Sequence, residues 1–537
     1  MEPGRFGDRR FTKESGTLRN PLVRVTAHQL QFPVQMGSPK NTAGSQDSTT
    51  AKRVGVITGP LVFLVIMLFV HPKGLSDAGI AVLASTAWIA IWWITEAIPI
   101  AATALLPIIL FPLTGALELQ ATTTSYGHQY IFLYIGGFLL AIAIEKWRLH
   151  KRIALNIIHA IGTSVSGIIL GFMIATAALS MWISNTATSV MMLPIGMAII
   201  SQLCNNPATN PMENEKFAKA LLLGIAYSAS IGGMATLVGT PPNLVLAGVV
   251  QELYGIEISF FQWLMFGLPI SLILLALCWI YLTRVAFRFE QASFPGGRAE
   301  IKKQLHAFGR IGFEEKMVLA VFGLTALAWI SRSFLQQQLG LFPRLDDTII
   351  AMVGGVLLFL LPANENKGPL LRWEDVKKLP WGIVLLFGGG MALAEAFKSS
   401  GLADWIGGQM TLLDGVSLIF LILILVTAVN FLTEITSNLA TTSMLLPILA
   451  PMALAIDVNP LILMVAATVA ASCAFMLPVA TPPNAVVFGS GHLRIPDMVR
   501  AGLGMNLISI VLLTLFVYFV LPLVWGLDTR AFPEAWK

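Results

Sequence analysis

The chain has 537 residues, of which 56% are hydrophobic and only 12% are charged. Soluble domains carry about 25% charged residues, so the composition indicates a polytopic membrane protein and excludes soluble enzymes and nucleic-acid binders. The formal net charge of +5 does not indicate nucleic-acid binding, because the basic residues gather in the polar stretches between apolar segments.

The N-terminal residues 1–53 are polar, with nine Lys or Arg and four acidic residues. They lack the apolar run of a signal peptide and are predicted to form a disordered tail. A second polar stretch, residues 284–316, carries seven basic and four acidic residues. Loops rich in Lys and Arg stay on the cytoplasmic side. Both stretches, and with them the N-terminus, are therefore predicted to be cytoplasmic, in a bacterial inner membrane or a plasma membrane.

A transmembrane helix needs about 20 apolar residues. The uninterrupted candidates are residues 54–71, 77–97, 258–283, 317–335, 347–362 and 504–526. Two further apolar stretches, 128–146 and 381–398, contain glycine runs near their middles, at Gly136-Gly137 and Gly388-Gly389-Gly390. Because each half of these stretches is too short to span, each is predicted to form a re-entrant helical hairpin that turns at the glycines.

Two polar segments inside apolar stretches are near copies of each other. Ser184–Ile195 and Ser437–Ile448 are identical at eight of twelve positions. Each copy is followed by the tetrapeptide Thr-Pro-Pro-Asn, at 240–243 and at 481–484. Polar groups at membrane depth are costly and indicate function. Matched interruptions in two halves of a membrane protein indicate a transporter binding site.

The order of hairpin, Ser-Asn break and Thr-Pro-Pro-Asn break occurs twice, which predicts an internal duplication. Inverted repeats are the common form of duplication in transporters. The predicted fold is an all-α polytopic membrane protein with about 11 transmembrane helices and two re-entrant hairpins. The predicted boundaries are a first repeat at 54–257 with breaks at 184–186 and 239–243, a second repeat at 258–527 with breaks at 437–439 and 480–484, and a short tail at 528–537.

Each break offers ligands for ions of both signs. The last carbonyls of an interrupted helix carry partial negative charge and suit a cation, whereas the first N–H groups of the next half-helix suit a carboxylate. The hydroxyls of Ser184 and Ser437 can add oxygens to a cation shell. The amides of Asn185 and Asn438 contain an acceptor and a donor, so they can contact cation and anion together.

The proline pairs end a helix and leave the preceding carbonyls, at Gly239 and Ala480, without N–H partners. These carbonyls can complete a cation site made of neutral oxygens. Such a site suits Na⁺ and is poor for Ca²⁺ or transition metals.

These motifs, together with the run Trp92-Trp93-Ile94-Thr95-Glu96-Ala97-Ile98-Pro99, resemble the divalent anion/sodium symporter family. Its members carry dicarboxylates, citrate and, in some branches, sulfate, and the resemblance covers about residues 54–527. It implies Na⁺-coupled symport of a small di- or tricarboxylate, of the succinate, malate, fumarate or citrate type, with two or more Na⁺ as coupling ions. It also implies a homodimer with an elevator mechanism, in which a transport domain slides against a scaffold domain.

The resemblance also implies the site residues. The first sodium site matches Ser180, Ser184, Asn185 and the carbonyl of Gly239, and the second matches Thr433, Ser437, Asn438 and the carbonyl of Ala480. Substrate carboxylates are expected at Asn185, Thr186, Asn438 and Leu439, with Thr240, Pro241, Thr481 and Pro482 nearby.

Leu439 departs from the family pattern, which has Thr at this position as at Thr186. A hydroxyl that donates to a carboxylate is worth about 1.5–3 kcal/mol, and Leu cannot supply it. One end of the substrate is then held by fewer donors or rests against an apolar wall. This leaves room for an acid that is bulkier than a C4 dicarboxylate.

Several alternatives stay open at this point. A Na⁺-independent carboxylate exchanger and a sulfate symporter both fit the same fold. Glu434, beside Thr433 in an apolar stretch, is either a coupling carboxylate or a structural charge. A membrane-embedded enzyme is not expected, because hydrolysis needs a nucleophile with a nearby base and the breaks contain no basic residue.

Overall fold

The computed structural model describes residues 44–161, 164–205, 207, 209–290, 297–364, 368–409, 416–529 and 531–536. Residues Thr49–Lys537 form one compact unit. Most of the predicted N-terminal tail, residues 1–43, lies outside the described residues. Its last part does not continue as a tail, because helix α1 begins at Gly44.

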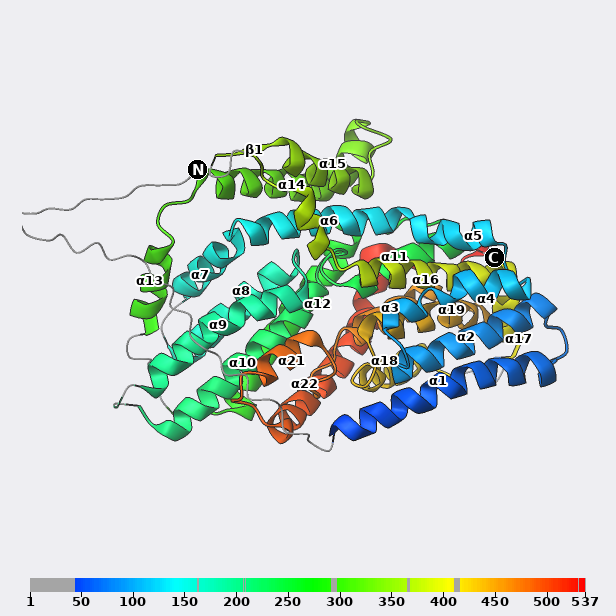
Figure 1. Ribbon diagram of the computed structural model, residues 1–537, viewed down its shortest axis with the longest axis horizontal. Coiled ribbons are helices and arrows are strands. Elements are labelled where there is room, and N and C mark those ends of the chain that lie inside the picture. The colour runs from blue at the N-terminus through cyan, green and yellow to red at the C-terminus, as the bar shows by residue number, and fades with distance from the viewer. Residues whose placement is uncertain are drawn as a thin grey trace, which may run out of the picture. The chain divides into compact units, whose positions relative to one another are not determined.

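The described secondary structure is almost entirely helical, as the composition predicted (Figure 1). The first half contains α1 (Gly44–Phe69), α2 (Asp77–Thr95), α3 (Ile100–Thr103), α4 (Leu106–Thr114), α5 (Leu119–Thr124), η1 (Ser125–Gly127), α6 (Gln129–Lys146), α7 (Leu149–Ile161), α8 (Val165–Ser180), α9 (Asn185–Cys204), α10 (Pro211–Gly233), α11 (Pro241–Tyr254), α12 (Phe260–Ile280) and η2 (Tyr281–Ala286).

The second half repeats this pattern of long and short helices. It contains α13 (Gly297–Ala307), α14 (Phe313–Leu339), α15 (Asp347–Leu360), the two-residue strands β1 (Pro362–Ala363) and β2 (Gly368–Pro369), η3 (Trp373–Lys378), α16 (Trp381–Ser399), α17 (Leu402–Gln409), α18 (Leu418–Leu432), α19 (Asn438–Ala455), α20 (Pro460–Ala471), α21 (Pro482–Phe488), α22 (Ile495–Leu515), η5 (Phe516–Val520), α23 (Leu521–Trp525) and η6 (Glu534–Trp536). The strands pair antiparallel, with Pro362 opposite Pro369.

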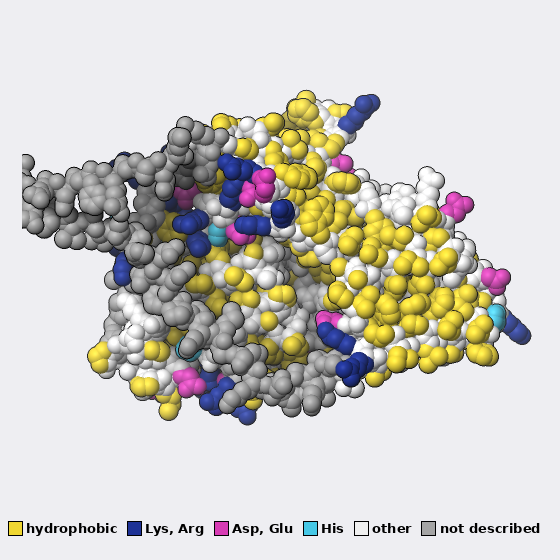
Figure 2. Space-filling view, in the orientation of Figure 1, with side chains coloured by type: hydrophobic (Ala, Val, Ile, Leu, Met, Phe, Trp, Pro, Cys, Tyr) yellow, Lys and Arg dark blue, Asp and Glu magenta, His cyan; other side chains and the backbone are white. Residues whose placement is uncertain are grey.

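Nine helical segments in the described part of the chain are long and apolar enough to cross a membrane. Five shorter apolar helices accompany them, among them α8 and α18, which end at Ser180 and Leu432, shortly before the predicted breaks at 184–186 and 437–439. Figure 2 shows hydrophobic side chains covering much of the visible face over α1, α2 and α4, where Leu61 and Leu113 are exposed. An apolar surface of this extent indicates contact with lipid, so the prediction of a polytopic membrane protein is confirmed.

The two glycine runs do not form turns, which corrects the predicted hairpins at 128–146 and 381–398. Helix α6 continues through Gly136 and α16 continues through Gly389. The glycines instead allow close helix packing. A Cβ at Gly136 would lie 2.6 Å from the carbonyl carbon of Ala351 in α15, and one at Gly389 would lie 2.7 Å from the carbonyl oxygen of Ala104.

The two halves interlock through matching helices. Helix α11 packs on α19 and α20 of the other half, and α21 packs on α9 and α10 (Figure 1). Helix α12 holds the same position in the first half as α22 holds in the second. Gly267 of α12 fits against the carbonyl of Met234, and Gly502 of α22 fits against the carbonyl of Phe475.

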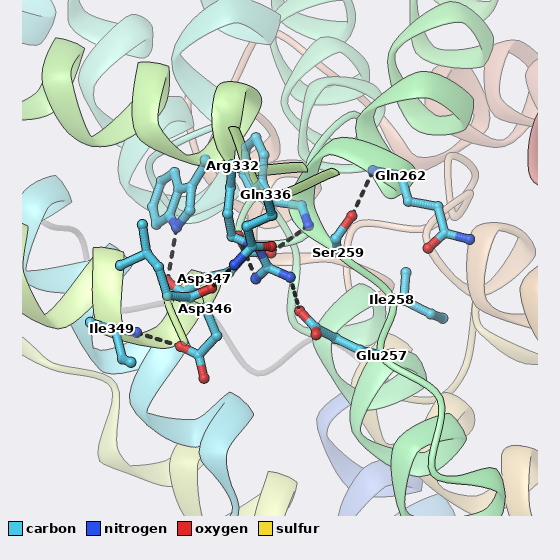
Figure 3. A network of polar contacts seen from close by, with 12 residues as sticks. Glu257, Ile258, Ser259, Gln262, Arg332, Gln336, Asp346, Asp347 and Ile349 are labelled. Carbon is cyan, nitrogen blue, oxygen red and sulfur yellow. Dashed lines mark hydrogen bonds and ion pairs between the residues drawn. The ribbon is translucent and has the colours of Figure 1, made fainter. Parts of the chain in front are cut away.

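A buried ionic network joins the loop before α12 to α14 and α15 (Figure 3). Arg332 in α14 pairs with Glu257 at 2.5 Å and with Asp347 at 3.1 Å. Asp347 also accepts a hydrogen bond of 2.6 Å from the backbone N–H of Phe260, the first residue of α12. The network therefore connects the end of the first half to the first two long helices of the second.

Candidate functional site

The first break places three oxygens close together. Helix α8 ends at Ser180 and α9 begins at Asn185, with Ser184 as the N-cap that accepts from the N–H of Ala187 at 3.2 Å. The Ser180 hydroxyl lies 2.7 Å from Asn185 Oδ1 and 2.6 Å from the carbonyl oxygen of Ala229 in α10. Ser180 is fully buried, so these oxygens meet inside the protein.

The second break has the same geometry. The Thr433 hydroxyl lies 2.7 Å from Asn438 Oδ1 and 2.9 Å from the carbonyl oxygen of Ala471. In both breaks the hydroxyl precedes the Asn by five residues, and the carbonyl comes from the second helix after the break, α10 or α20. The two sets of oxygens, Ser180, Asn185 and Ala229 and then Thr433, Asn438 and Ala471, are named here the first and second half-site.

Each half-site has more acceptors than protons. A hydroxyl carries one proton, so it donates to the amide oxygen or to the carbonyl, but not to both at once. The hydroxyl oxygen of each half-site makes two short contacts with other oxygens. One of these two contacts therefore has no hydrogen atom between the oxygens. A hard cation bound by neutral oxygens would stabilise such a group, and Na⁺ is the ion that suits these ligands best.

The Thr-Pro-Pro-Asn segments brace the loops that follow α10 and α20. Asn243 Nδ2 donates to the carbonyl of Thr236 at 2.8 Å, and Asn484 Nδ2 donates to the carbonyl of Leu477 at 3.0 Å. Each amide also donates to the carbonyl ten residues before it, Asn243 to that of Gly233 at 3.4 Å and Asn484 to that of Ala474 at 3.2 Å. The Asn of this motif therefore fixes the loop and is itself buried.

Two glycines, Gly233 and Gly239, allow the loop after α10 to pack closely against the first half-site. A Cβ at Gly233 would lie 2.5 Å from Asn185 Oδ1, and a Cβ at Gly239 would lie 2.5 Å from the carbonyl oxygen of Gly233. The segment 233–239 is thus packed directly against the amide of Asn185. This arrangement brings the predicted ligands Ser180, Asn185 and Gly239 into one neighbourhood.

The two loops also meet each other. Cys473 Sγ lies 3.8 Å from Met234 Sδ, and the rings of Tyr227 and Phe475 have centroids 5.0 Å apart. Residues near 234 and 474, although far apart in sequence, are therefore neighbours. The loops that follow α10 and α20 are therefore in contact.

The residues predicted to contact substrate differ in exposure. Thr186 and Pro482 are exposed, and Asn185, Asn438 and Pro241 are half-buried. Thr240, Thr481 and Leu439 are buried, and Leu439 belongs to the hydrophobic core. The loop after α20 is more exposed than the loop after α10: Val479 is 82% exposed, whereas its counterpart Val238 is 7% exposed.

Sequence reasoning missed part of the site. The carbonyls of Ala229 and Ala471 carry no signal in the residue type, because every residue has a carbonyl. Gly233 had a signal, as a glycine eight residues before the Pro-Pro pair, but its partner Asn185 is distant in sequence. Glu434 was considered, yet its partners in the 475–477 loop were not predicted.

These observations define a class of protein. A multi-pass helical membrane protein with two matched helix breaks at the meeting of its repeats has the architecture of a secondary transporter. The chain belongs to the sodium:sulfate symporter family, because residues 50–525 match the family model for the sodium:sulfate symporter transmembrane region.

Two relatives carry names that describe transport. The sodium-dependent dicarboxylate transporter SdcS of Staphylococcus saprophyticus is 49% identical over 492 residues, which covers 91% of this chain and 95% of the relative. The protein of the same name from Staphylococcus aureus strain MRSA252 is 48% identical over 484 residues, covering 89% and 93%. The resemblance seen in the motifs is thereby confirmed, and a membrane-embedded enzyme is excluded.

Solved structures with a related fold are also membrane transporters. The efflux pump MtrF of Neisseria gonorrhoeae has a TM-score of 0.53 at 13% identity, over 90% of this chain and 97% of that one. The transporter YdaH of Alcanivorax borkumensis has a TM-score of 0.52 at 13% identity, over 89% and 99%. At this identity the similarity concerns the fold alone.

Proposed function

We propose that the protein is a Na⁺-coupled symporter that takes up small dicarboxylates of the succinate, malate and fumarate type. The observation that carries the proposal is the pair of half-sites, each with three buried or half-buried oxygens and a single hydroxyl proton. The names of the relatives, sodium-dependent dicarboxylate transporters at 48% and 49% identity, support the ion and the substrate class.

In this proposal each half-site holds one Na⁺. The ligands of the first ion are Ser180, Ser184, Asn185 and the carbonyls of Gly239 and Ala229. The ligands of the second are Thr433, Ser437, Asn438 and the carbonyls of Ala480 and Ala471. The distances of 2.6–2.9 Å from the two hydroxyls to their neighbouring oxygens support sets of ligands that need little rearrangement.

The substrate is proposed to lie at the starts of α9 and α19. Both helices begin at an Asn whose side chain is half-buried, and the free N–H groups of a helix N-terminus attract a carboxylate. Asn185, Thr186 and Asn438 would contact the carboxylates, with Leu439, Thr240, Pro241, Thr481 and Pro482 around them. Each bound Na⁺ would then lie beside a carboxylate and stabilise it, which couples the two.

The assembly is proposed to be a homodimer in a bacterial inner membrane or a plasma membrane, with the N-terminus cytoplasmic. Transport is proposed to follow an elevator mechanism, in which the site moves as one body against a scaffold. The amphipathic helix α7 supports this proposal. It connects α6 to α8, buries Leu155 and Ile158, and keeps Asn156 exposed, as expected of a helix that lies at the membrane surface.

The deciding experiment is uptake of labelled succinate, citrate and sulfate into proteoliposomes, with and without an inward Na⁺ gradient. Succinate uptake that depends on Na⁺ is the expected result. Uptake that ignores Na⁺ but needs an internal carboxylate would instead identify an exchanger. Uptake of sulfate in preference to succinate would identify a sulfate symporter.

A further inference from the structure

The two half-sites differ in formal charge. The hydroxyl residue of the second half-site, Thr433, is followed directly by Glu434, which is 3% exposed. The equivalent residue after Ser180 in the first half-site is Met181. A carboxylate residue therefore follows the hydroxyl residue of the second half-site in the chain, and a thioether residue follows that of the first.

Glu434 is bound to the loop that follows α20. Its Oε1 accepts from the N–H groups of Phe475 at 2.7 Å and Met476 at 2.9 Å, and its Oε2 accepts from the N–H of Leu477 at 3.0 Å. Asn506 Nδ2 in α22 donates to Oε1 at 2.8 Å. Four donors compensate the carboxylate for its lost hydration, but all four are neutral.

The first half makes the same connection without charge. There Thr236 Oγ1 donates to the carbonyl of Met181 at 2.5 Å, and the N–H of Gly239 donates to Thr236 Oγ1 at 3.0 Å. The loop after α10 is thus tied to the first break by a hydroxyl and a carbonyl. A hydroxyl and a carbonyl are thus enough to hold such a loop in the first half, where no carboxylate is used.

The surroundings of Glu434 are also more polar than those of Met181. Asn430, one turn before Glu434, donates to the carbonyl of Cys473 at 2.9 Å, and its counterpart in the first half is Ala177. Asn506 corresponds to Ser271, by the same offset that relates Gly502 to Gly267. Of the two amides only Asn506 donates to Glu434, and its counterpart in the first half is the shorter Ser271.

Glu434 has no cationic partner among the residues that the structure describes. None of the ion pairs among the described residues includes it. A buried charge without an opposite charge is costly, and a cation a few ångströms away in a medium of low dielectric constant reduces that cost. The second half-site is the candidate position for such a cation, because Thr433 directly precedes Glu434 in the chain and Ala471 lies four residues before Phe475, which Glu434 binds.

We propose that Glu434 makes the second half-site the tighter of the two Na⁺ sites, so that this site fills first as the Na⁺ concentration rises. The inference rests on the proposed function. Glu434 acts as a positioning residue: it attracts the ion through its charge and holds the 475–477 loop, without contacting the substrate. The first half-site then binds its ion more weakly.

The test is binding of radioactive ²²Na⁺ to the purified full-length protein without substrate. The wild type is expected to bind Na⁺ in two phases of different affinity. Glu434→Gln is expected to weaken the tighter phase about tenfold, as the loss of one nearby charge would, and to leave the weaker phase in place. Ser180→Ala is expected to remove the weaker phase only.

Two further variants separate charge from structure. Glu434→Asp keeps the charge and is expected to retain the tighter phase. Met181→Glu places a carboxylate in the first half and is expected to tighten the weaker phase. In proteoliposomes, Glu434→Gln should raise the Na⁺ concentration for half-maximal uptake more than it raises the succinate KM at saturating Na⁺, a difference that general loss of structure would not produce.

A single binding phase in the wild type, or equal weakening of both phases by Glu434→Gln, would overturn the inference. If Glu434→Gln does not fold, Met181→Glu decides, and an unchanged weaker phase in that variant would overturn it too. A wild type that neither binds Na⁺ nor needs it for uptake would instead refute the proposed function.

Discussion

Ser180 and Asn185 lie on either side of a helix break and bring their side-chain oxygens to 2.7 Å from each other. Thr433 and Asn438 repeat the relationship at 2.7 Å in the second half. A hydroxyl and an amide five residues apart would not meet in this way on a continuous helix, where residues three and four apart are neighbours. The break itself therefore creates the half-site.

Asn185→Ala should weaken both the Na⁺ response and substrate binding. The variant removes the amide oxygen from the first half-site and the donor at the start of α9. Loss of a ligand to a charged group is worth about 1.5–3 kcal/mol, so uptake assays should give at least a tenfold rise in half-saturating Na⁺ and in succinate KM. A change in only one of the two constants would contradict a shared ligand.

Gly233→Ala should abolish most Na⁺-dependent uptake. Its Cβ would lie 2.5 Å from Asn185 Oδ1, and overpacking of this kind costs about 1–3 kcal/mol. Gly137→Ala is the matched control, because its Cβ would meet Val238 Cγ1 at an ordinary 3.4 Å. Transport rates of the two variants at equal expression provide the measurement, and equal rates would show that the contact with Asn185 is unimportant.

Leu439→Thr should strengthen binding of short dicarboxylates relative to larger acids, because it restores the hydroxyl that Thr186 has in the first half. Competition of succinate and citrate for labelled succinate uptake measures the change. Leu439 is 6% exposed, so an unpaired hydroxyl there would cost about 1–3 kcal/mol of stability. An unchanged order of preference would show that position 439 does not face the substrate.

Arg332→Gln should destabilise the protein by about 3–5 kcal/mol, because Asp347 would remain buried without its partner. The side chains of Arg332 and Asp347 are only 7% and 5% exposed. Lys52→Gln is the control, since the Lys52–Glu96 pair is 49% and 55% exposed and such pairs contribute about 1 kcal/mol or less. Thermal unfolding in detergent measures both variants, and equal shifts would contradict the argument.

The ion pair between Lys146 and Asp375, at 2.7 Å, should stabilise the protein at neutral pH but not in acid. Partial burial alone would raise the pKa of Asp375, but hydrogen bonds from Lys146 and the N–H of Arg372 outweigh it and hold the pKa below its usual value. A carboxyl group with a lowered pKa contributes stability above its unfolded pKa and loses it as the pH falls through the folded pKa.

Lys146→Gln should therefore lower the unfolding temperature at pH 7, and the difference from the wild type should shrink as the pH falls below about 4, the usual pKa of Asp. Unfolding temperatures of both proteins over this range provide the test. A difference that is independent of pH would show that Lys146 acts through packing and not through its charge.

Much of the fold could be predicted from local patterns. The apolar segments that became α2, α12 and α14 follow from length and hydrophobicity alone, since any helix in lipid must satisfy its backbone internally. The positions of the helix breaks could also be predicted, because Ser-Asn and Thr-Pro-Pro-Asn are unfavourable inside a helix and favourable at its N-terminus. The turns assigned to Gly136 and Gly388 were wrong because a glycine run fits both a turn and a close helix contact, and only the neighbour, Ala351 or Ala104, decides between them.

The sequence by itself determined that this is a membrane protein whose repeated motifs place Ser180, Asn185, Thr433 and Asn438 at interrupted helices, because composition, repeated motifs and proline are properties of the chain. Only the tertiary structure decided which backbone carbonyls complete each half-site, that Glu434 holds the 475–477 loop, and that Leu439 is buried. These features depend on contacts between segments that are 38 to 49 residues apart, such as Ser180 with Ala229 and Thr433 with Ala471. Such contacts are set by how whole helices pack, and the residue types on either side do not reveal them.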